Sequence, residues 1–240
     1  MKSAGHLPDT RCPERRSPDE DDSGALVLAD ESNGKLDGIG RADAPSSWKH
    51  TRGLEPDIDL TWHHVIPLRC LTTVWNGLVE GEHWSTAERF LHVAGADNAS
   101  HLVEEMKAGR IGGEERDVLH EHVTWQGWNI VEGPGGLCRS DDPGDQYERF
   151  HWTSLSGNQR ATLMAVSAIY SEMGPLHRQL DRAEPRKISS QQAKSLSDSL
   201  STNRLALRKK APIPFSEGMW DKLDPGRAGK RKPRYRKKAF

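Results

Sequence analysis

The sequence predicts an α+β fold that is mostly helical, with one small pair of strands. Two segments of extended character, "LTWHHVIPL" (60–68) and "TWQGWNIVEGPGG" (124–136), enclose a stretch in which apolar residues recur with helical spacing. A longer periodic segment, "NQRATLMAVSAIYSEMG" (158–174), follows them and predicts a further helix. Hydrophobic residues make up 34% of the 240 residues, a low fraction for a packed chain, so we expect polar extensions at both ends.

The domain organisation follows from where the aromatic residues lie. Seven of the eight tryptophans fall between Trp48 and Trp152, which indicates a core domain over residues 46–180. Within it, the helical stretch near 81–123 is expected to be an insertion. Residues 1–45 are polar and acidic and predict a disordered segment, whereas residues 181–240 predict a polar linker and a basic tail.

The first elements of the core have clear signals. The extended segment is expected to end at Pro67, and the apolar spacing of "RCLTTVWNGLVEG" predicts a helix that stops at Gly81. Ser85 and Glu88 stand in capping-box register, which predicts a second helix that closes at Gly95.

The later elements are read in the same way. Two more short helices precede the extended segment over 124–136, and an acidic loop follows it. The helix over 158–174 is expected to end at Gly174 and Pro175, because glycine favours helix termini and proline cannot continue a helix. The stretch after Pro185 is polar and predicts at most a weak helix.

Charge is divided between the two ends of the chain, although the net charge is −1. Residues 1–60 hold 13 Asp and Glu against 8 Lys and Arg, whereas residues 201–240 hold 13 Lys and Arg against 3 acids. A basic end is typical of a surface that binds nucleic acid; the alternative is a solvated tail that keeps the protein in solution. The candidate nucleic-acid-binding residues are Arg208, Lys209, Lys210, Lys230, Arg231, Lys232, Arg234, Arg236, Lys237 and Lys238.

The cysteines and the N-terminus indicate the compartment. Cys12, Cys70 and Cys138 are far apart and odd in number, which argues against a disulfide framework or a zinc ribbon and favours a reducing compartment. The N-terminus has no apolar core of a signal peptide, and no apolar run reaches the length of a membrane span. We therefore expect a cytoplasmic protein, or one secreted by a dedicated system without a signal peptide, with no membrane contact.

The adjacent histidines of "LTWHHVIPL" are the main chemical signal. Successive side chains of a strand point to opposite faces, so His63 and His64 cannot both enter one core. One interpretation is that one histidine is exposed and the other is hydrogen-bonded in the core. The other is that His63 binds a metal while His64 faces a substrate.

The segments "HHVIP" and "WNIVEGP" together resemble the HNH/endonuclease VII superfamily of ββα-metal (His-Me finger) nucleases, in particular its WHH, GHH and AHH toxin-like branches. The resemblance covers residues 60–152. It implies a small β-hairpin and ββα-metal core, metal-dependent hydrolysis of phosphodiester bonds in DNA, and a bacterial toxin or effector that an immunity protein neutralises.

The resemblance also implies roles for single residues. His63 matches the metal position and His64 matches the general base, for which an imidazole that titrates near pH 6.5 is suited. Asn129 matches the asparagine that braces the motif and orients the base; the alternative is an ordinary strand-end residue. The sequence departs from the family in spacing, because 64 residues lie between His64 and Asn129.

A second departure concerns the other metal ligand, for which many family members have histidine. Asp141 and Asp142 occupy this region, and their carboxylates suit Mg²⁺, with Mn²⁺, Zn²⁺ and Ni²⁺ as alternatives. The same "DDPGD" segment is also typical of an exposed turn. Arg139 could contact the scissile phosphate, or pair with these acids.

A competing hypothesis is a nucleic-acid- or protein-binding module whose ββα site is not catalytic. The missing second histidine and the long insertion favour it. The Walker, GxSxG, HExxH and GxGxxG patterns do not occur in the sequence. The sequence therefore gives no support to a nucleotide-binding loop, a serine hydrolase, a zincin or a Rossmann domain.

Overall fold

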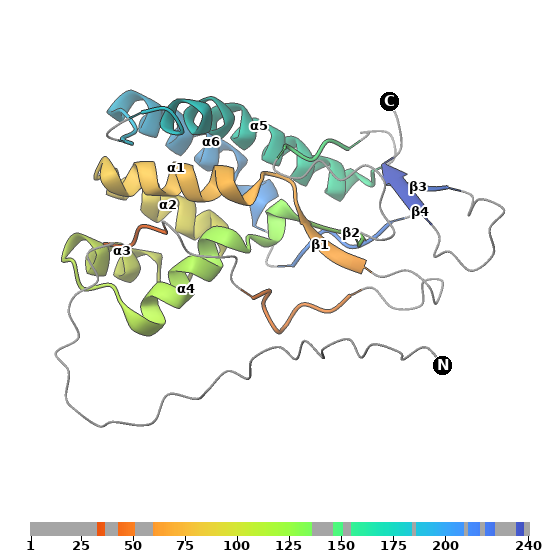
Figure 1. Ribbon diagram of the computed structural model, residues 1–240, viewed down its shortest axis with the longest axis horizontal. Helices are drawn as coiled ribbons and strands as arrows, with labels where there is room; N and C mark the ends of the chain where they lie inside the picture. Colours follow the sequence, from red (N-terminus) through yellow and green to blue (C-terminus); the bar gives the residue numbers. More distant parts are fainter. Residues whose placement is uncertain are drawn as a thin grey trace, which may run out of the picture.

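The computed structural model confirms the mostly helical α+β class (Figure 1). It describes residues 33–36, 43–50, 60–135, 146–150, 155–183, 186–208, 211–216, 219–223 and 234–237. The helices lie side by side at one end of the molecule, and the strands extend from them at the other (Figure 1). None of the helices in these segments is both long and apolar enough to cross a membrane.

The two extended segments form an antiparallel pair, as the sequence predicted. Strand β1 (Leu60–His64) pairs with β2 (Ile130–Pro134), so that His64 stands opposite Ile130 and His63 opposite Val131. Residues 211–216 run along the other edge of β2, where the N–H of Glu132 donates to the carbonyl of Ile213 at 2.8 Å. The C-terminal strands β3 (Trp220–Leu223) and β4 (Arg234–Lys237) form a second antiparallel pair.

The chain between β1 and β2 is helical and brings β2 back to pair with β1. It forms α1 (Leu68–Glu80), α2 (Trp84–Ala94), α3 (Ala99–Lys107), α4 (Gly113–Thr124) and a 3-10 turn, η1 (Gly127–Asn129). Helix α1 contacts α2 and α4 on one side and the later helix α5 on the other. The apolar spacing of α1 is the reason for this central position, since it buries Leu71, Val74, Trp75 and Leu78.

Helix α1 ends at Gly81 and α2 at the left-handed Gly95, as predicted, but the expected capping box of α2 is wrong. The helix begins at Trp84 with His83 as its N-cap, and it has no side-chain cap. The carbonyl of His83 already accepts the N–H groups of Thr86 and Ala87, so Ser85 lies inside the first turn and cannot cap it.

The predicted end of the long helix at Gly174 and Pro175 is also wrong. Helix α5 (Gly157–Leu180) starts at a capping box formed by Ser156 and Gln159 and passes through both residues. Pro175 removes its own N–H from the helix and its ring crowds the carbonyl of the preceding turn, but the turns around it bury Met173, Leu176 and Leu180. Burial of these side chains outweighs the local cost of the proline.

Part of the expected linker belongs to the folded body. Helix α6 (Ser190–Leu207) begins at a capping box formed by Ser189 and Gln192 and packs against α5 and α2. Its buried side chains include Leu196, Leu200 and Leu207. The stretch is polar in composition because only one face of the helix is apolar. That one face is sufficient to pack the helix against the core.

Part of the segment expected to be disordered is likewise packed. The indole N–H of Trp75 donates to the carbonyl of Gly34 at 2.9 Å, and the Asn76 side chain accepts the N–H of Leu36 at 2.8 Å. Leu36 is buried in the hydrophobic core. Residues 33–36 therefore form a strap across α1.

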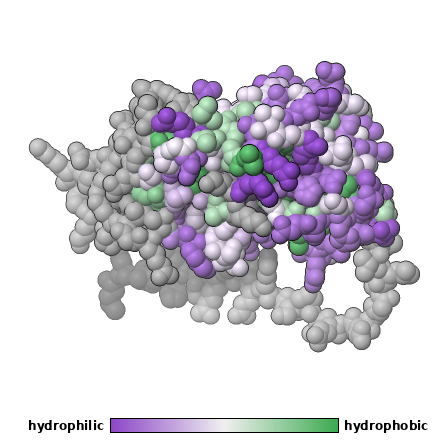
Figure 2. Space-filling model, turned by 180° about the vertical axis from the view of Figure 1, so that it is seen from behind, coloured by the Kyte–Doolittle hydropathy of each residue, from purple (hydrophilic) through white to green (hydrophobic). Residues whose placement is uncertain are grey.

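The described residues seen in Figure 2 are largely hydrophilic, with small hydrophobic spots among them. Among the described residues, the exposed large hydrophobic side chains are Val118, Met164 and Leu205. They come from three different helices, α4, α5 and α6.

Candidate active site

Asn129 is brought to the histidine segment, despite the 64 residues between them. Its backbone carbonyl accepts the N–H of Val65 at 2.8 Å. Its side-chain amide accepts the N–H of Ile66 at 2.7 Å and donates to the carbonyl of Ile66 at 3.0 Å. Asn129 is fully buried, so its amide holds the turn that follows His64 and does not contact the imidazole directly.

The ring of His64 is held by the end of helix α4. Its Nε2 lies 2.6 Å from the carbonyl oxygen of Thr124, and its ring centroid lies 5.2 Å from that of Trp125. A carbonyl oxygen only accepts hydrogen bonds, so Nε2 carries the proton. In the neutral ring the lone pair is then on Nδ1, which is the atom able to take a proton from another group.

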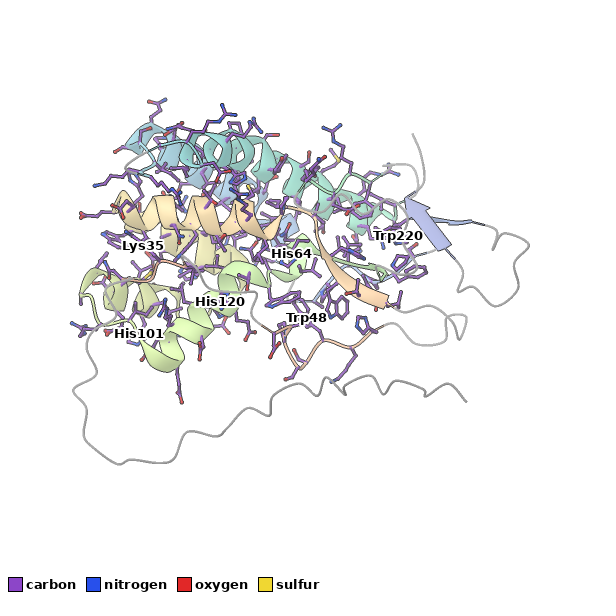
Figure 3. The ribbon with its side chains drawn as sticks, in the orientation of Figure 1. Lys35, Trp48, His64, His101, His120 and Trp220 are labelled. Atoms are coloured by element: carbon purple, nitrogen blue, oxygen red, sulfur yellow. The ribbon has the colours of Figure 1, made fainter. Side chains whose placement is uncertain are left out.

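His63 has different surroundings, on the other face of β1. Its Nε2 lies 2.9 Å from the carbonyl oxygen of Pro134, and its ring lies 6.0 Å from that of Trp220. Gly133 makes this contact possible, since a Cβ at that position would collide with both Trp220 and His63. Figure 3 shows His64 where β1 meets α1 and Trp220 at the far end of the strands.

The sequence did not reveal a histidine–glutamate pair beside His64. Nδ1 of His50 lies 2.9 Å from Oε1 of Glu132, whose other oxygen accepts the N–H of Phe215 at 2.9 Å. Glu132 is only 1% exposed, whereas the side chain of His50 is 45% exposed. A carboxylate that accepts Nδ1–H leaves the lone pair of a neutral imidazole on Nε2, as in the acid–histidine pairs of many enzymes.

Tryptophan rings connect this pair to His64. The ring of His50 stacks on Trp62 at 4.2 Å, and Trp48 makes edge contacts of 5.8 Å with both Trp62 and Trp125. Trp62 and Glu132 stand opposite each other in the β1–β2 register, and His64 follows Trp62 by two residues. We call the set His50, Trp48, Trp62, His64, Trp125 and Glu132 the histidine–tryptophan face.

One signal in the sequence could have found part of this face. Glu132 is the single acid within the apolar run "WNIVEGP", and a buried carboxylate needs partners. His50 gave no comparable signal, because it lies in a polar stretch and meets Glu132 only through the tertiary fold.

Most of the other predicted site residues lie outside the segments that the structure describes. Arg139, Asp141 and Asp142 lie outside the described residues, as do Lys209, Lys210, Lys230, Arg231, Lys232 and Lys238. Arg208 is exposed directly after α6, and the backbone of Arg234, Arg236 and Lys237 forms β4. Within the described segments, no group of three or more His, Cys, Asp or Glu side chains could hold a metal ion.

Comparison with known proteins gave no relative. No protein-family model matches the chain, and no curated protein or solved structure matches it either.

Proposed function

We propose that the protein is a metal-dependent, HNH-like endonuclease that hydrolyses phosphodiester bonds in DNA, with His64 as the general base. The observation that carries the proposal is the hydrogen bond from Nε2 of His64 to the carbonyl of Thr124. It sets the tautomer in which Nδ1 can accept a proton from an attacking water. Asn129 supports this role by holding the backbone that follows His64.

Rigid support matters because a general base must be held close to its target geometry. His64 is partly buried between the end of α4 and the Trp125 ring, and its strand is paired along its whole length with β2. The His50–Glu132 pair lies on the same face and supplies a second imidazole whose orientation is fixed by a buried carboxylate. The proposed general base therefore lies on the histidine–tryptophan face, whereas His63, the proposed metal ligand, lies on the other face of β1.

The metal is a further part of the proposal. His63 donates from Nε2 to a backbone carbonyl, which is the usual arrangement around a histidine that ligates through its other nitrogen. Asp141 and Asp142 would complete the ligand set. A bound divalent cation would neutralise charge on the phosphate. The described residues alone do not form such a set, so the ligand assignment depends on the two aspartates.

The biological setting of the proposal is a bacterial toxin or effector, with DNA as substrate and an immunity protein as partner. It is supported by the WHH-like sequence resemblance and by the basic C-terminal residues. The basic residues would attract the DNA backbone regardless of its sequence.

A specific observation favours a second candidate function, a non-catalytic nucleic-acid- or protein-binding module. His63 and His64 leave β1 on opposite faces and bond to Pro134 and Thr124 respectively. Two histidines with satisfied rings on separate faces are also what a purely structural strand pair would contain.

The test is cleavage of supercoiled plasmid DNA by the wild type and by His64→Ala, in Mg²⁺ and in Mn²⁺. Loss of a general base is expected to lower the rate by about 10²–10⁴-fold. His101→Ala is the matched control, because His101 is an exposed histidine on α3 and should leave the rate unchanged. Equal activity of His64→Ala and wild type would overturn the proposed base.

A binding measurement separates the two candidate functions. Calorimetric titration of Mg²⁺ or Mn²⁺ into wild type and His63→Ala should give a difference between the proteins if His63 is a ligand. No metal binding and no cleavage by the wild type, with DNA binding retained, would favour the non-catalytic module.

A further inference from the structure

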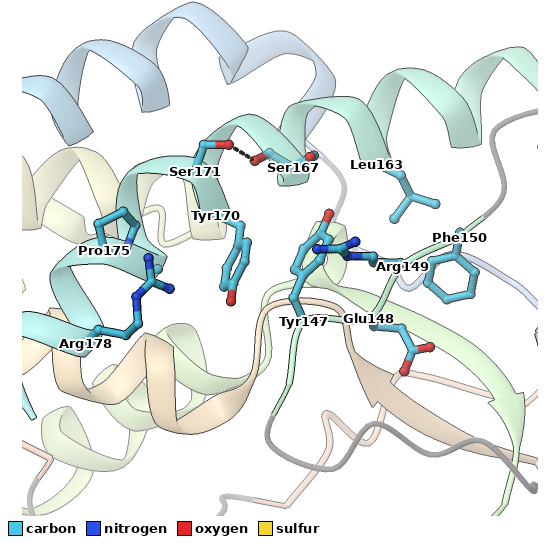
Figure 4. Close-up of a pocket in the computed structure, with 11 residues that line it drawn as sticks. Tyr147, Glu148, Arg149, Phe150, Leu163, Ser167, Tyr170, Ser171, Pro175 and Arg178 are labelled. Carbon is cyan, nitrogen blue, oxygen red and sulfur yellow. Dashed lines mark hydrogen bonds between the residues drawn. The ribbon is translucent and has the colours of Figure 1, made fainter. Parts of the chain in front are cut away.

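A cavity of about 510 Å³ opens between helix α5 and residues 147–150, and none of the residues of the histidine–tryptophan face lines it. Its size is in the usual range for small-molecule sites. Figure 4 shows the side chains that line it, which include Tyr147, Arg149, Leu163, Tyr170, Pro175 and Arg178. Neither the predicted site residues nor the proposed reaction uses this cavity.

Two tyrosines form an aromatic wall. The rings of Tyr147 and Tyr170 stack with centroids 4.3 Å apart and planes 14° apart. Burial raises the pKa of Tyr147, and a hydrogen bond with Ser167 and the charge of Arg149 partly oppose this, so the phenol is neutral at physiological pH. Tyr170 lies over Gly174, where a side chain would crowd the ring.

Two arginines supply positive charge on the two sides of the tyrosine pair (Figure 4). Arg149 and Arg178 are both exposed, and neither forms a hydrogen bond or ion pair with another residue of the described segments. Glu148 also lines the cavity, but only 1% of its surface is exposed to solvent. Among the described residues that line the cavity, the exposed charged side chains are therefore the two arginines.

Hydroxyl groups complete the lining. Ser167 and Ser171 lie one turn apart on α5, and the hydroxyl of Ser171 donates to the carbonyl of Ser167 at 2.9 Å. Leu163, Phe150 and Pro175 add apolar surface. Guanidinium groups suit phosphate oxygens, and an aromatic wall suits a planar base.

We propose that this cavity binds a nucleotide, with its base against the tyrosine pair and its phosphate held by one of the two flanking arginines, Arg149 or Arg178. The nucleotide could be a free mononucleotide or one unit of a nucleic-acid strand, since both present the same base and phosphate. The second source has a structural basis: the N–H of Glu148 donates to the carbonyl of Val65 at 2.9 Å, which joins the cavity wall to the residue after His64.

Binding is measured by calorimetry on the full chain in the presence of EDTA, so that the result does not depend on cleavage. The probes are 5′-AMP, adenosine, inorganic phosphate and a single-stranded dT 12-mer. Tight binding of AMP alone assigns the free mononucleotide, whereas binding of the 12-mer assigns the strand. AMP should bind better than either adenosine or phosphate, because each of these lacks one of the two recognised groups.

Variants locate the site. Arg149→Gln or Arg178→Gln should weaken binding by about tenfold or more, because the arginine that holds the phosphate loses its charged hydrogen bond. Arg160→Gln is the matched control, because Arg160 is exposed on α5 but does not line the cavity. Tyr170→Ala should weaken binding by about tenfold, and Tyr170→Phe should retain it because the ring is kept.

Three results would overturn the proposal: no binding of AMP or the 12-mer by wild type, binding unchanged in the Arg149→Gln/Arg178→Gln double variant, or phosphate bound as tightly as AMP. A failure of DNA cleavage would leave these measurements unaffected. The two proposals therefore fail separately.

Discussion

The side-chain amide of Asn129 makes two hydrogen bonds with the backbone of one residue, Ile66: its oxygen accepts and its nitrogen donates. Because the site is fully buried, removing the amide would leave a backbone N–H and a backbone carbonyl without partners or water. We expect Asn129→Ala to lower the free energy of unfolding by about 2–4 kcal/mol. Chemical denaturation followed by circular dichroism measures this change.

The control for this prediction is Asn98→Ala. Asn98 is exposed and precedes α3, but its side chain makes no capping hydrogen bond. Its removal should change stability by less than about 0.5 kcal/mol. Similar losses in the two variants would mean that the Asn129 amide does not brace the turn.

The buried thiol of Cys70 should make the free energy of unfolding depend on pH in the alkaline range. Burial on α1 raises the pKa of its thiol from the ordinary 9.0 to about 12. Between these values the unfolded chain releases the thiol proton while the folded chain keeps it, so the free energy of unfolding should fall as pH rises above 9. The slope contributed by this group is at most about 1.4 kcal/mol per pH unit.

Comparison with Cys70→Ala isolates this contribution, because the other titrating groups are common to both proteins. Urea denaturation from pH 8 to 10.5 under reducing conditions should show the wild type losing stability more steeply than the variant. Parallel curves would show that the Cys70 thiol ionises equally in both states.

At the scale of elements, α6 illustrates how a polar sequence can belong to a core. Leu200 and Leu205 lie on the same helix, but Leu200 is fully buried against α5 and α2 whereas Leu205 is 85% exposed. We expect Leu200→Ala to cost about 2–5 kcal/mol, because it removes buried methyl groups and leaves a cavity. Thermal and urea unfolding followed by circular dichroism measure this change.

Leu205→Ala makes the same chemical change on the exposed side and should alter stability by less than about 0.5 kcal/mol. If Leu200→Ala were equally harmless, α6 would be a detached helix and the predicted linker would stand.

Signals within single elements were reliable where the deciding interactions are local. The apolar spacing of α1, its end at Gly81 and the pairing segments around His64 and Ile130 were all visible in the sequence. The end of α5 was predicted wrongly because Pro175 is a local signal, whereas the helix continues owing to burial of Leu176 and Leu180 against other elements.

At the scale of the whole molecule, the proposed DNA binding predicts a dependence on salt. Each lysine or arginine contact with a duplex phosphate contributes about −0.9 to the slope of log K against log salt concentration. Replacing Lys230, Arg231 and Lys232 by glutamine should reduce the magnitude of this slope by up to about 2.7. Fluorescence anisotropy with a labelled duplex at several salt concentrations measures it.

A charge-matched control replaces Lys107, Arg160 and Lys194 by glutamine. These residues are exposed on three different helices, and the two lysines pair with Glu104 and Asp198. The control should leave the slope unchanged. Equal effects of the two triple variants would mean that the basic C-terminus only adds net charge.

The sequence by itself determined the strands β1 and β2, the helices between them and one long-range relation. The period of apolar residues set the helices, β-branched and aromatic runs set the strands, and the resemblance led to Asn129 as the brace of the histidine segment. These features depend on interactions between near neighbours, or on a motif with a fixed local geometry.

Only the tertiary structure decided which groups meet. It placed His63 and His64 in separate surroundings, joined His50 to Glu132, and built a cavity with Arg149 and Arg178 on the two sides of a tyrosine pair. These contacts join residues up to 82 positions apart in the chain. Their partners are chosen by how whole helices and strands pack, and burial energy of that kind is summed over the molecule and cannot be read from a short window of sequence.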